Sequence, residues 1–452
     1  MTATKLPPGP RAPGLFQALR YLRDPVRFMT DCHRRYGDVF TMNLGKLGTL
    51  VTLVRPDHIQ EMFKSTSPSL ASGQGKLLEF YVGENSLFVT EGTDHKQARG
   101  MLAPPIALSR MKVYSQLVQE ATLSATRDWA PGRQGQVLDS ALEAAVEVMV
   151  RAIMGLSGEE SRPVRQAVRE YIDGTTAPLL FFRWLRADLG HCSPGGRWHR
   201  LRARCHEVIE REIARHRDPS CRDDSMLGVL LASEEGAALP DAALRDHIFT
   251  MIMAGHESSG LTLSLAMYWL HRTPDALARL QAELDALGPE PNADALSGCA
   301  YLEATCQETL RITPIVPNIV RRLVGPLEIA GWSLPAGVRL AASAFLAPRR
   351  PETYPAPARF LPERFLDRRY KPSEFLPFGG GSFHCIGDVL ALHQLKISLG
   401  TLVTRFRCEG LASPEPKIVR RGMVLMPEGG CRLLVRERRS ISVPSGSAAV
   451  PG

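Results

Sequence analysis

The stretch Phe378-Gly379-Gly380-Gly381-Ser382-Phe383-His384-Cys385-Ile386-Gly387 places one cysteine in a glycine-rich loop, directly ahead of a helix-like segment at 388–406. Glycine permits positive φ angles and lets a backbone approach a flat group closely. The amides of the loop and of the helix start can point at the sulfur and keep it a thiolate. The pattern indicates that Cys385 is a ligand, and a lone thiolate of this kind suits the axial position of a haem iron.

Composition places the chain among globular proteins. It has 452 residues, of which 44% are hydrophobic and 23% charged. This length exceeds the usual ceiling for one simple core, so we expect two domains or one large mixed domain. The net charge of +8 is spread along the chain, with no basic run interleaved with aromatic residues, which argues against nucleic acid as a partner.

The cysteines and the start of the chain bear on its location. Nine cysteines form an odd set without a CxxC pair or zinc-like spacing, for which a reducing cytoplasmic compartment is the simplest interpretation. Residues 1–11 contain no apolar core of a signal peptide and no spanning segment. We therefore expect a soluble, monomeric protein of the cytoplasm without a transmembrane anchor.

Most of the chain is predicted to be helical. Residues 1–13 are Pro-rich and expected to lie extended, residues 14–435 to form one domain, and residues 436–452 to be a disordered tail. A hairpin is expected from 38–43 and 49–54. Helices are expected at 25–36, 56–63, 141–154, 163–172, 198–216, 241–270, 274–287 and 301–312. The predicted fold class is mainly α, a large helical domain with a smaller β-rich subdomain.

One long helix is apolar enough to resemble a membrane span. This segment, 248–270, carries His256 and Glu257 at its centre, which would be costly in lipid, so we interpret it as a helix through a protein core, loosened at its midpoint. Ala254 and Ser258 share one face, and Glu257 lies about 100° from Ser258. An acid beside an alcohol predicts a proton relay. Two alternatives remain, that Ser258 only bonds the preceding turn and that Glu257 only pairs with a basic neighbour.

Five motifs follow one another along the chain. The positions that carry them are His95 and Arg99; Ala254, Glu257 and Ser258; Glu308 and Arg311; Arg364 within Phe360–Phe365; and Phe378, Gly381, Cys385 and Gly387. In that order they resemble the HxxxR helix, the oxygen-activation motif, the ExxR pair, the PERF segment and the FxxGxxxCxG loop of the cytochrome P-450 family of haem-thiolate monooxygenases. The likeness runs from residue 6 to about residue 430 and implies the cytochrome P-450 fold.

The resemblance implies haem b (iron protoporphyrin IX) as cofactor, with Cys385 as the iron ligand and Phe378 against its sulfur. The implied cofactor-binding set is Cys385, His95, Arg99, Arg321, Phe378, Gly381, Gly387 and Ala254. Of these, His95, Arg99 and Arg321 would bind the propionates, with the adjacent Arg322 leaving the register of that segment open.

Further roles follow from the same resemblance. Glu257 and Ser258 would be catalytic, delivering protons during oxygen activation. A second set, Glu308, Arg311 and Arg364, would form a buried network behind the haem, for which the planar, always charged guanidinium is suited. An ordinary surface ion pair is the alternative for any isolated ExxR.

Two positions depart from the family pattern. Ser258 stands where the family more often has threonine, and it lacks the methyl group that stiffens χ1, so coupling of oxygen use to product is expected to be looser. Phe383 stands where the family usually has His or Arg against a propionate. The neighbouring His384 either points elsewhere or is exposed on the proximal side, so haem retention should depend more on His95 and Arg99.

The implied function is insertion of one oxygen atom from O2 into a lipophilic molecule such as a fatty acid, terpenoid or polyketide, as in soluble bacterial enzymes of secondary metabolism. Apolar pocket walls are expected at 73–90, 175–189, 313–320 and around Met423 if their side chains face inward. The connector 177–185 is expected to be a lid packed on its own protein rather than on membrane. The alternatives are a haem-thiolate isomerase or dehydratase, or a non-catalytic haem-based ligand-binding protein.

Electrons are expected from a separate protein, because the chain shows no second cofactor domain. A ferredoxin or flavodoxin with its NAD(P)H reductase is the implied partner. Lys96, Lys371 and Lys396 lie in segments that the resemblance places on the proximal side, where they would offer a basic dock for an acidic partner.

Overall fold

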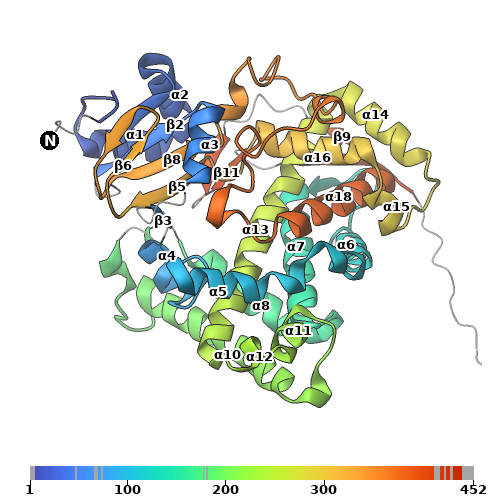
Figure 1. Cartoon of the computed structure of the whole chain (residues 1–452). Helices are drawn as coiled ribbons and strands as arrows, with labels where there is room; N and C mark the ends of the chain where they lie inside the picture. Colours follow the sequence, from blue (N-terminus) through green and yellow to red (C-terminus); the bar gives the residue numbers. More distant parts are fainter. Residues whose placement is uncertain are drawn as a thin grey trace, which may run out of the picture.

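The computed structural model describes residues 6–45, 48–65, 70–72, 75–176, 178–179, 182–411, 418–421, 424–427 and 431–439. Figure 1 shows most strands of the larger sheet gathered on one side beside α1, α2 and α3, while most of the other helices surround α13, which runs through the middle of the molecule. This is the expected mainly helical fold with a smaller β-rich part.

The helices account for most of the described chain. They are α1 (Gly14–Arg23), α2 (Pro25–Tyr36), α3 (Pro56–Lys64), α4 (Gly75–Val82), α5 (Gly92–Leu102), α6 (Met111–Ala125), α7 (Val137–Met154), α8 (Gly158–Gly174), α10 (Pro194–Arg217), α11 (Met226–Ala232), α12 (Glu234–Ala237), α13 (Asp241–Arg272), α14 (Pro274–Asp285), α15 (Ala293–Ser297), α16 (Ala300–Ile312), α17 (Arg364–Asp367) and α18 (Asp388–Arg405).

Start signals explain why several predicted helices match the structure, whereas α7, α8 and α10 begin four or five residues before the predicted starts at 141, 163 and 198. The α2 boundaries agree with the prediction, because the Asp24 side chain accepts a hydrogen bond from Arg27 N at 3.0 Å and Pro25 occupies the first helical position. Helix α13 also lies where it was predicted. It continues as an α-helix through residues 254–260, so the expected loosening does not appear as a break.

The larger sheet has the strand order β1-β2-β8-β5-β3. Its strands are β1 (Val39–Asn43), β2 (Thr49–Leu53), β3 (Leu70–Ser72), β5 (Asn318–Leu323) and β8 (Arg339–Ser343). Strands β1 and β2 form the predicted hairpin, β2 pairs in parallel with β8, and β5 pairs antiparallel with both β8 and β3. Strand β5 matters for the site because it carries Arg321.

Smaller sheets complete the β structure. Two are the pairs β6 (Leu327–Ile329) with β7 (Trp332–Leu334) and β10 (Ile418–Arg421) with β11 (Val424–Pro427), and the third is β4 (Gln134–Gln136), β12 (Arg432–Arg438) and β9 (Phe406–Gly410). Strand β12 continues to Arg438, past the expected start of the tail at 436, while 440–452 lie outside the described residues. At the other end, Thr41 N in β1 bonds Pro8 O at 2.9 Å, which holds the extended Pro-rich segment against the sheet.

Close packing against α7 sets the position of α13. A Cβ on Gly255 would lie 2.4 Å from the sulfur of Met149, and one on Gly260 would lie 2.8 Å from the Leu142 side chain. The two glycines therefore let the helices approach each other more closely than larger residues would. Among the described residues, no helix has the length and apolar character needed to cross a bilayer.

Candidate active site

The glycine-rich loop before α18 is closed by a backbone hydrogen bond from Cys385 N to Phe378 O, 2.8 Å long. Gly381 has a φ of 68°, in the left-handed region that favours glycine, and a Cβ there would lie 2.7 Å from the carbonyl oxygen of Phe63 in α3. At Gly387 a Cβ would meet no heavy atom within 4 Å. The loop is thus packed tightly on α3 at one end and borders open space beside the cysteine.

Cys385 is exposed, although its neighbours His384 and Ile386 are half-buried and most residues of the following helix α18 are buried. Enough protein surrounds the sulfur that burial raises the pKa of the Cys385 thiol, while the backbone N–H of Gly387 favours the thiolate and lowers it. Exposure and a raised pKa occur together because polypeptide crowds the thiol on one side and leaves it open on the other. Such a sulfur is accessible to a flat group and needs a cation beside it to remain ionised.

The middle of α13 has a partly exposed face. Met251, Ala254, Gly255 and Ser258 share this face and are half-buried, whereas most residues of the helix on either side are buried. Ile386, next to the cysteine, packs against the same hydrophobic cluster that contains buried residues of this part of α13. The cysteine loop and the open face of α13 therefore border the same region of the interior.

Ser258 bonds the preceding turn of α13, as the alternative to the proton relay expected. Its Oγ donates to Ala254 O at 2.5 Å, one turn earlier in the helix. The next hydroxyl along the same face, Thr262 Oγ1, donates to Ser258 O at 2.7 Å. Both bonds turn hydroxyls toward carbonyls of α13 itself. Glu257 is half-buried on the adjacent position.

Three basic side chains converge on the cysteine loop from two elements distant in sequence. From α5, Arg99 Nη1 donates to His384 O at 2.6 Å, and the ring of His95 lies 4.6 Å from that of Phe383. From β5, the guanidinium of Arg321 lies 4.7 Å from the centre of the Phe383 ring. The sequence places these residues far apart, and the fold brings them to one loop.

Arg321 is buried without a carboxylate partner among the described residues. Its guanidinium donates to Val320 O and Gly380 O, each at 3.0 Å. Burial lowers the pKa of Arg321 to about 10. Burial also lowers the pKa of His95, and the neighbouring arginines add to this. Because a buried charge is normally paired, this cluster fits an anionic group such as a haem propionate.

The structure shows which of Arg321 and Arg322 on β5 faces inward, and in which direction His384 points. Arg322 points outward and pairs with Glu91 at 3.2 Å, so Arg321 is the inward residue of the two. His384 Nε2 lies 2.9 Å from Asp388 Oδ2 at the start of α18, and this hydrogen bond raises the pKa of the imidazole. His384 therefore turns toward α18 and ties the loop to that helix.

Glu308, Arg311 and Arg364 lie together in the interior. The Glu308 carboxylate receives a fork from Arg311, with Nε at 2.6 Å and Nη2 at 2.8 Å, and a third bond from Arg364 Nε at 3.2 Å. Leu361 N completes the set at 2.8 Å. The side chains of Glu308 and Arg311 are both 0% exposed, so this ExxR pair is not an ordinary surface ion pair.

Sequence reasoning missed Tyr354. Its buried ring faces both guanidiniums of the network, 5.2 Å from Arg311 and 5.8 Å from Arg364. Carbonyl oxygens of Pro348 and Pro357 accept the remaining Arg311 Nη1 bonds at 3.0 and 2.9 Å. None of these partners has a sequence signal, because an aromatic residue or a proline carbonyl can occur in any loop.

A second missed contact fastens the loop after α4 to α13. Asn85 donates to the buried carboxylate of Asp246 through its backbone N at 3.3 Å and its Nδ2 at 2.9 Å. Arg245 binds the other carboxylate oxygen at 2.9 Å and bridges to Glu210 of α10 at 2.7 Å. A Cβ on Gly83, where φ is 90°, would lie 2.1 Å from Asp246. The glycine is therefore required for this junction, which joins one expected pocket wall to α13.

Only some of the apolar side chains in the expected pocket walls face inward. Leu179 and Tyr81 are buried, but Phe182 and Trp184 are exposed, so the prediction that these two line a pocket is wrong. Among the described residues of the connector 177–185, residues 182–184 are exposed, so this part is not packed on its own protein as expected. Leu180, Phe181 and Met423 lie outside the described residues.

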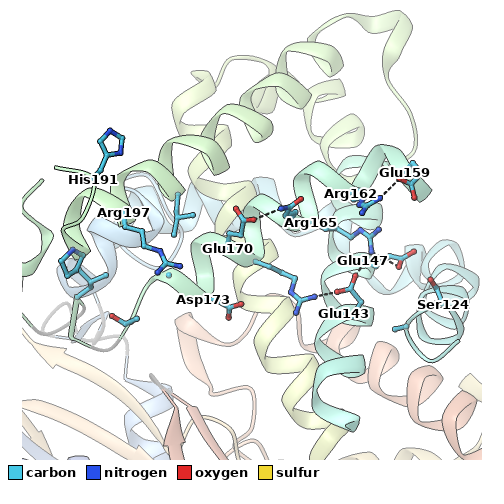
Figure 2. A pocket seen from close by; sticks show the side chains of 18 of the residues that line it. Ser124, Glu143, Glu147, Glu159, Arg162, Arg165, Glu170, Asp173, His191 and Arg197 are labelled. Atoms are coloured by element: carbon cyan, nitrogen blue, oxygen red, sulfur yellow. Dashed lines mark hydrogen bonds and ion pairs between the residues drawn. The ribbon is translucent and has the colours of Figure 1, made fainter. Parts of the chain in front are cut away.

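A cleft of about 1420 Å³ lies elsewhere, beside α7, α8 and the start of α10 (Figure 2). Its walls are charged: Arg165 bonds Glu143 at 2.8 Å and Glu147 at 3.4 Å, and Arg169 also pairs with Glu143. Thr176 and Leu179 of the expected pocket wall 175–189 line it, but none of the predicted catalytic or cofactor-binding residues does. Several of these charged side chains pair with one another, and a lining of ion pairs offers few apolar contacts to a lipophilic substrate.

Comparison with known proteins identifies the family. The model of the family described as cytochrome P450 matches residues 7–435. The chain belongs to the cytochrome P450 family. A relative named "Putative cytochrome P450 135B1" from Mycobacterium tuberculosis is 31% identical, with 98% of this chain and 94% of the relative covered. "Putative cytochrome P450 138" from the same species is 29% identical, with 96% and 97% covered.

A solved structure shares the fold. The retinoic acid-bound cyanobacterial CYP120A1 aligns with a TM-score of 0.81 and 22% identity, covering 96% of this chain and 99% of that one. Membership of the cytochrome P450 family makes the chain an oxidoreductase of the monooxygenase class, with haem b as its cofactor. The exposed thiol and the basic cluster, for which the described part of the chain supplies no carboxylate partner to Arg321, fit that cofactor.

Proposed function

We propose that this P450 inserts one oxygen atom of O2 into a lipophilic small molecule by hydroxylation or epoxidation. Two electrons and two protons accompany each O2, so the second oxygen atom leaves as water. The observation that carries the proposal is the convergence of His95, Arg99 and Arg321 on the loop whose Cys385 is exposed. When bound, haem supplies the oxygen chemistry.

The proposed residue roles divide between binding and orientation. Cys385 ligates iron, Phe378 shields its sulfur, and the basic cluster holds the propionates. Gly381 and Gly387 shape the loop, and the small side chain of Ala254 leaves room beside the cofactor. The network of Glu308, Arg311 and Arg364 supports the loop side of the site.

Proton delivery is assigned to Ser258 and Glu257. In the present rotamer the Ser258 Oγ proton lies on the bond to Ala254 O, so the hydroxyl must turn, or hold a water with its lone pairs, to serve as a donor. Serine turns more easily about χ1 than threonine because it lacks the branching methyl group. Glu257, half-buried one position away, connects this hydroxyl to solvent.

The proposal is tested with the haem-loaded enzyme, a surrogate ferredoxin system and a lipophilic substrate found by its spin-state shift. Ser258→Ala is expected to lower product formed per NADH by about tenfold and to raise peroxide release, because it removes the hydroxyl that guides protons. Ser259→Ala, on a buried neighbouring position, is the matched control, and Ser258→Thr should restore coupling. Unchanged coupling in Ser258→Ala would contradict the proton-relay role of Ser258. Consumption of NADH by the wild type without oxygenated product would contradict the monooxygenase proposal.

The substrate class is assigned from apolar residues near the open face of α13. Met251 and Met253 are half-buried on the helix, and Ile315, Val424 and Met426 form a buried cluster with other residues of α13 and α7. These side chains favour an apolar substrate such as a fatty acid, terpenoid or polyketide.

The redox partner is proposed to be an acidic ferredoxin or flavodoxin. Lys96 and Lys371 are exposed, as the dock requires. Lys396 is not part of it: its ammonium is buried and bonded to Glu303 at 2.7 Å and to Ser297 O at 2.6 Å, so that prediction is wrong. Arg369, exposed two residues before Lys371, takes its place in the proposed dock.

Raising ionic strength from about 0.05 to 0.5 M is expected to slow reduction by such a partner about tenfold, because salt screens attraction between exposed charges. Lys371→Glu should slow reduction at low salt, and Arg211→Glu on the exposed surface of α10 should leave it unchanged. Stopped-flow reduction under carbon monoxide measures the rate. A rate independent of salt would remove the electrostatic dock.

A further inference from the structure

Helix α1 turns its apolar face to solvent. Leu15, Phe16, Leu19 and Leu22 recur at helical spacing along one face, and their exposed fractions lie between 38% and 67%. Surface helices normally bury such a face. Four large apolar side chains grouped on one exposed face are a feature of surfaces that contact another body.

The opposite face of α1 shows that this orientation is built into the fold. Gln17 is its buried residue, 1% exposed, and its Nε2 donates to Pro10 O at 3.0 Å and Ala12 O at 2.7 Å. Its Oε1 accepts from Asn43 N of β1 at 3.0 Å. A polar residue thus fastens α1 to the sheet with all of these bonds made, which leaves the apolar face pointing outward.

The surroundings of α1 are basic. Residues 6–36 contain six arginines (Arg11, Arg20, Arg23, Arg27, Arg34 and Arg35) and two aspartates, and α1 itself has no acidic residue. All six arginines are exposed. A second copy docked through the same face would bring two clusters of like charge together, which disfavours a dimer. An anionic partner with an apolar interior satisfies both features.

We propose that α1 docks on an anionic lipid bilayer, with its leucines and phenylalanine in the boundary between headgroups and acyl chains and its arginines among the phosphates. An interfacial helix has this combination of an apolar face with flanking basic residues. A second exposed apolar segment carries Phe182, Trp184 and Leu189 beside Arg183. In Figure 1, α1 and this green loop both lie along the left edge of the molecule. The docking is peripheral and does not depend on the proposed substrate.

The test is flotation of the full-length, haem-loaded protein with vesicles of phosphatidylcholine and phosphatidylglycerol at 7:3, compared with phosphatidylcholine alone. The wild type should float with the anionic vesicles and bind at least about tenfold less well to neutral ones. Leu15→Gln, Phe16→Gln and Leu19→Gln combined should lower binding at least about tenfold. A matched double variant, Leu108→Gln with Val113→Gln, changes exposed apolar residues outside α1 and should bind like wild type.

A charge variant separates the two contributions. Arg23→Glu with Arg27→Glu should weaken binding to the anionic vesicles and leave binding to neutral vesicles unchanged. The carbon monoxide spectrum and melting temperature show that each variant is folded and loaded. Absence of wild-type binding to anionic vesicles, or equal binding by the α1 triple variant, overturns the proposal. The proposal is also overturned if the wild type does not bind vesicles but forms a dimer in solution that the triple variant abolishes.

Discussion

Replacing Cys385 by serine is expected to abolish thiolate ligation and to lower monooxygenase activity by at least about a hundredfold, since electron donation by the sulfur favours O–O cleavage. A serine hydroxyl has a far higher pKa than a thiol, and burial already raises the pKa of Cys385 above its ordinary value. The alkoxide would therefore not form where the thiolate does. The measurement is the spectrum of the reduced protein with carbon monoxide, together with product formation.

The control for this variant is Cys192→Ser. Cys192 is exposed on the loop before α10, so its loss should change neither spectrum nor activity. Haem content is measured in both variants, because His95 and Arg99 of α5 and Arg321 of β5 remain beside the loop and can hold haem without the thiolate. A Cys385→Ser protein that kept the family's characteristic carbon monoxide spectrum would show that the iron ligand lies elsewhere.

Replacing Glu308 by alanine is expected to cost about 3–5 kcal/mol of stability and to prevent recovery of haem-loaded protein. The carboxylate accepts bonds from Arg311, Arg364 and Leu361 N, and its removal would leave two buried guanidiniums without their anion. Glu308→Gln keeps the shape but not the charge and should fall between wild type and alanine. Thermal melting and haem content per chain measure the effect.

The chain contains its own matched control for this prediction. Glu159 and Arg162 form a second ExxR pair at the start of α8, 3.3 Å apart, with side chains 88% and 71% exposed. Because water solvates both partners, Glu159→Ala should change stability by less than about 1 kcal/mol. Equal losses for Glu159→Ala and Glu308→Ala would contradict the explanation by burial.

The ExxR comparison also shows what a short motif can predict. Residues 212–215 repeat the pattern a third time, with Glu212 and Arg215 bonded at 2.8 Å on α10. Local spacing predicts an ion pair at each position, because residues three apart on a helix are neighbours. Only their order relative to the other motifs distinguished Glu308, and burial is what sets its energetic importance.

Side-chain direction likewise depended on partners distant in sequence. Arg321 and Arg322 are equivalent by composition, and the pairing of β5 with β8 and β3 decides that Arg321 faces the cysteine loop. Lys396 seemed available for docking on the helix sequence alone, but Glu303 of α16 pairs with it. The exposure of Phe182, Trp184 and the apolar face of α1 was likewise not predictable from the sequence, since hydrophobic residues normally turn inward.

The sequence by itself determined the cysteine loop and the helix starts that capping residues and prolines set, because these depend on residues within a few positions of one another. It also determined the family, through the order of five short motifs along the chain. Tertiary structure alone decided which charges are buried, which basic residues meet at the loop, and that α1 shows its apolar face to solvent. These outcomes depend on contacts between residues hundreds of positions apart, such as Arg99 with His384, whose burial no local pattern specifies.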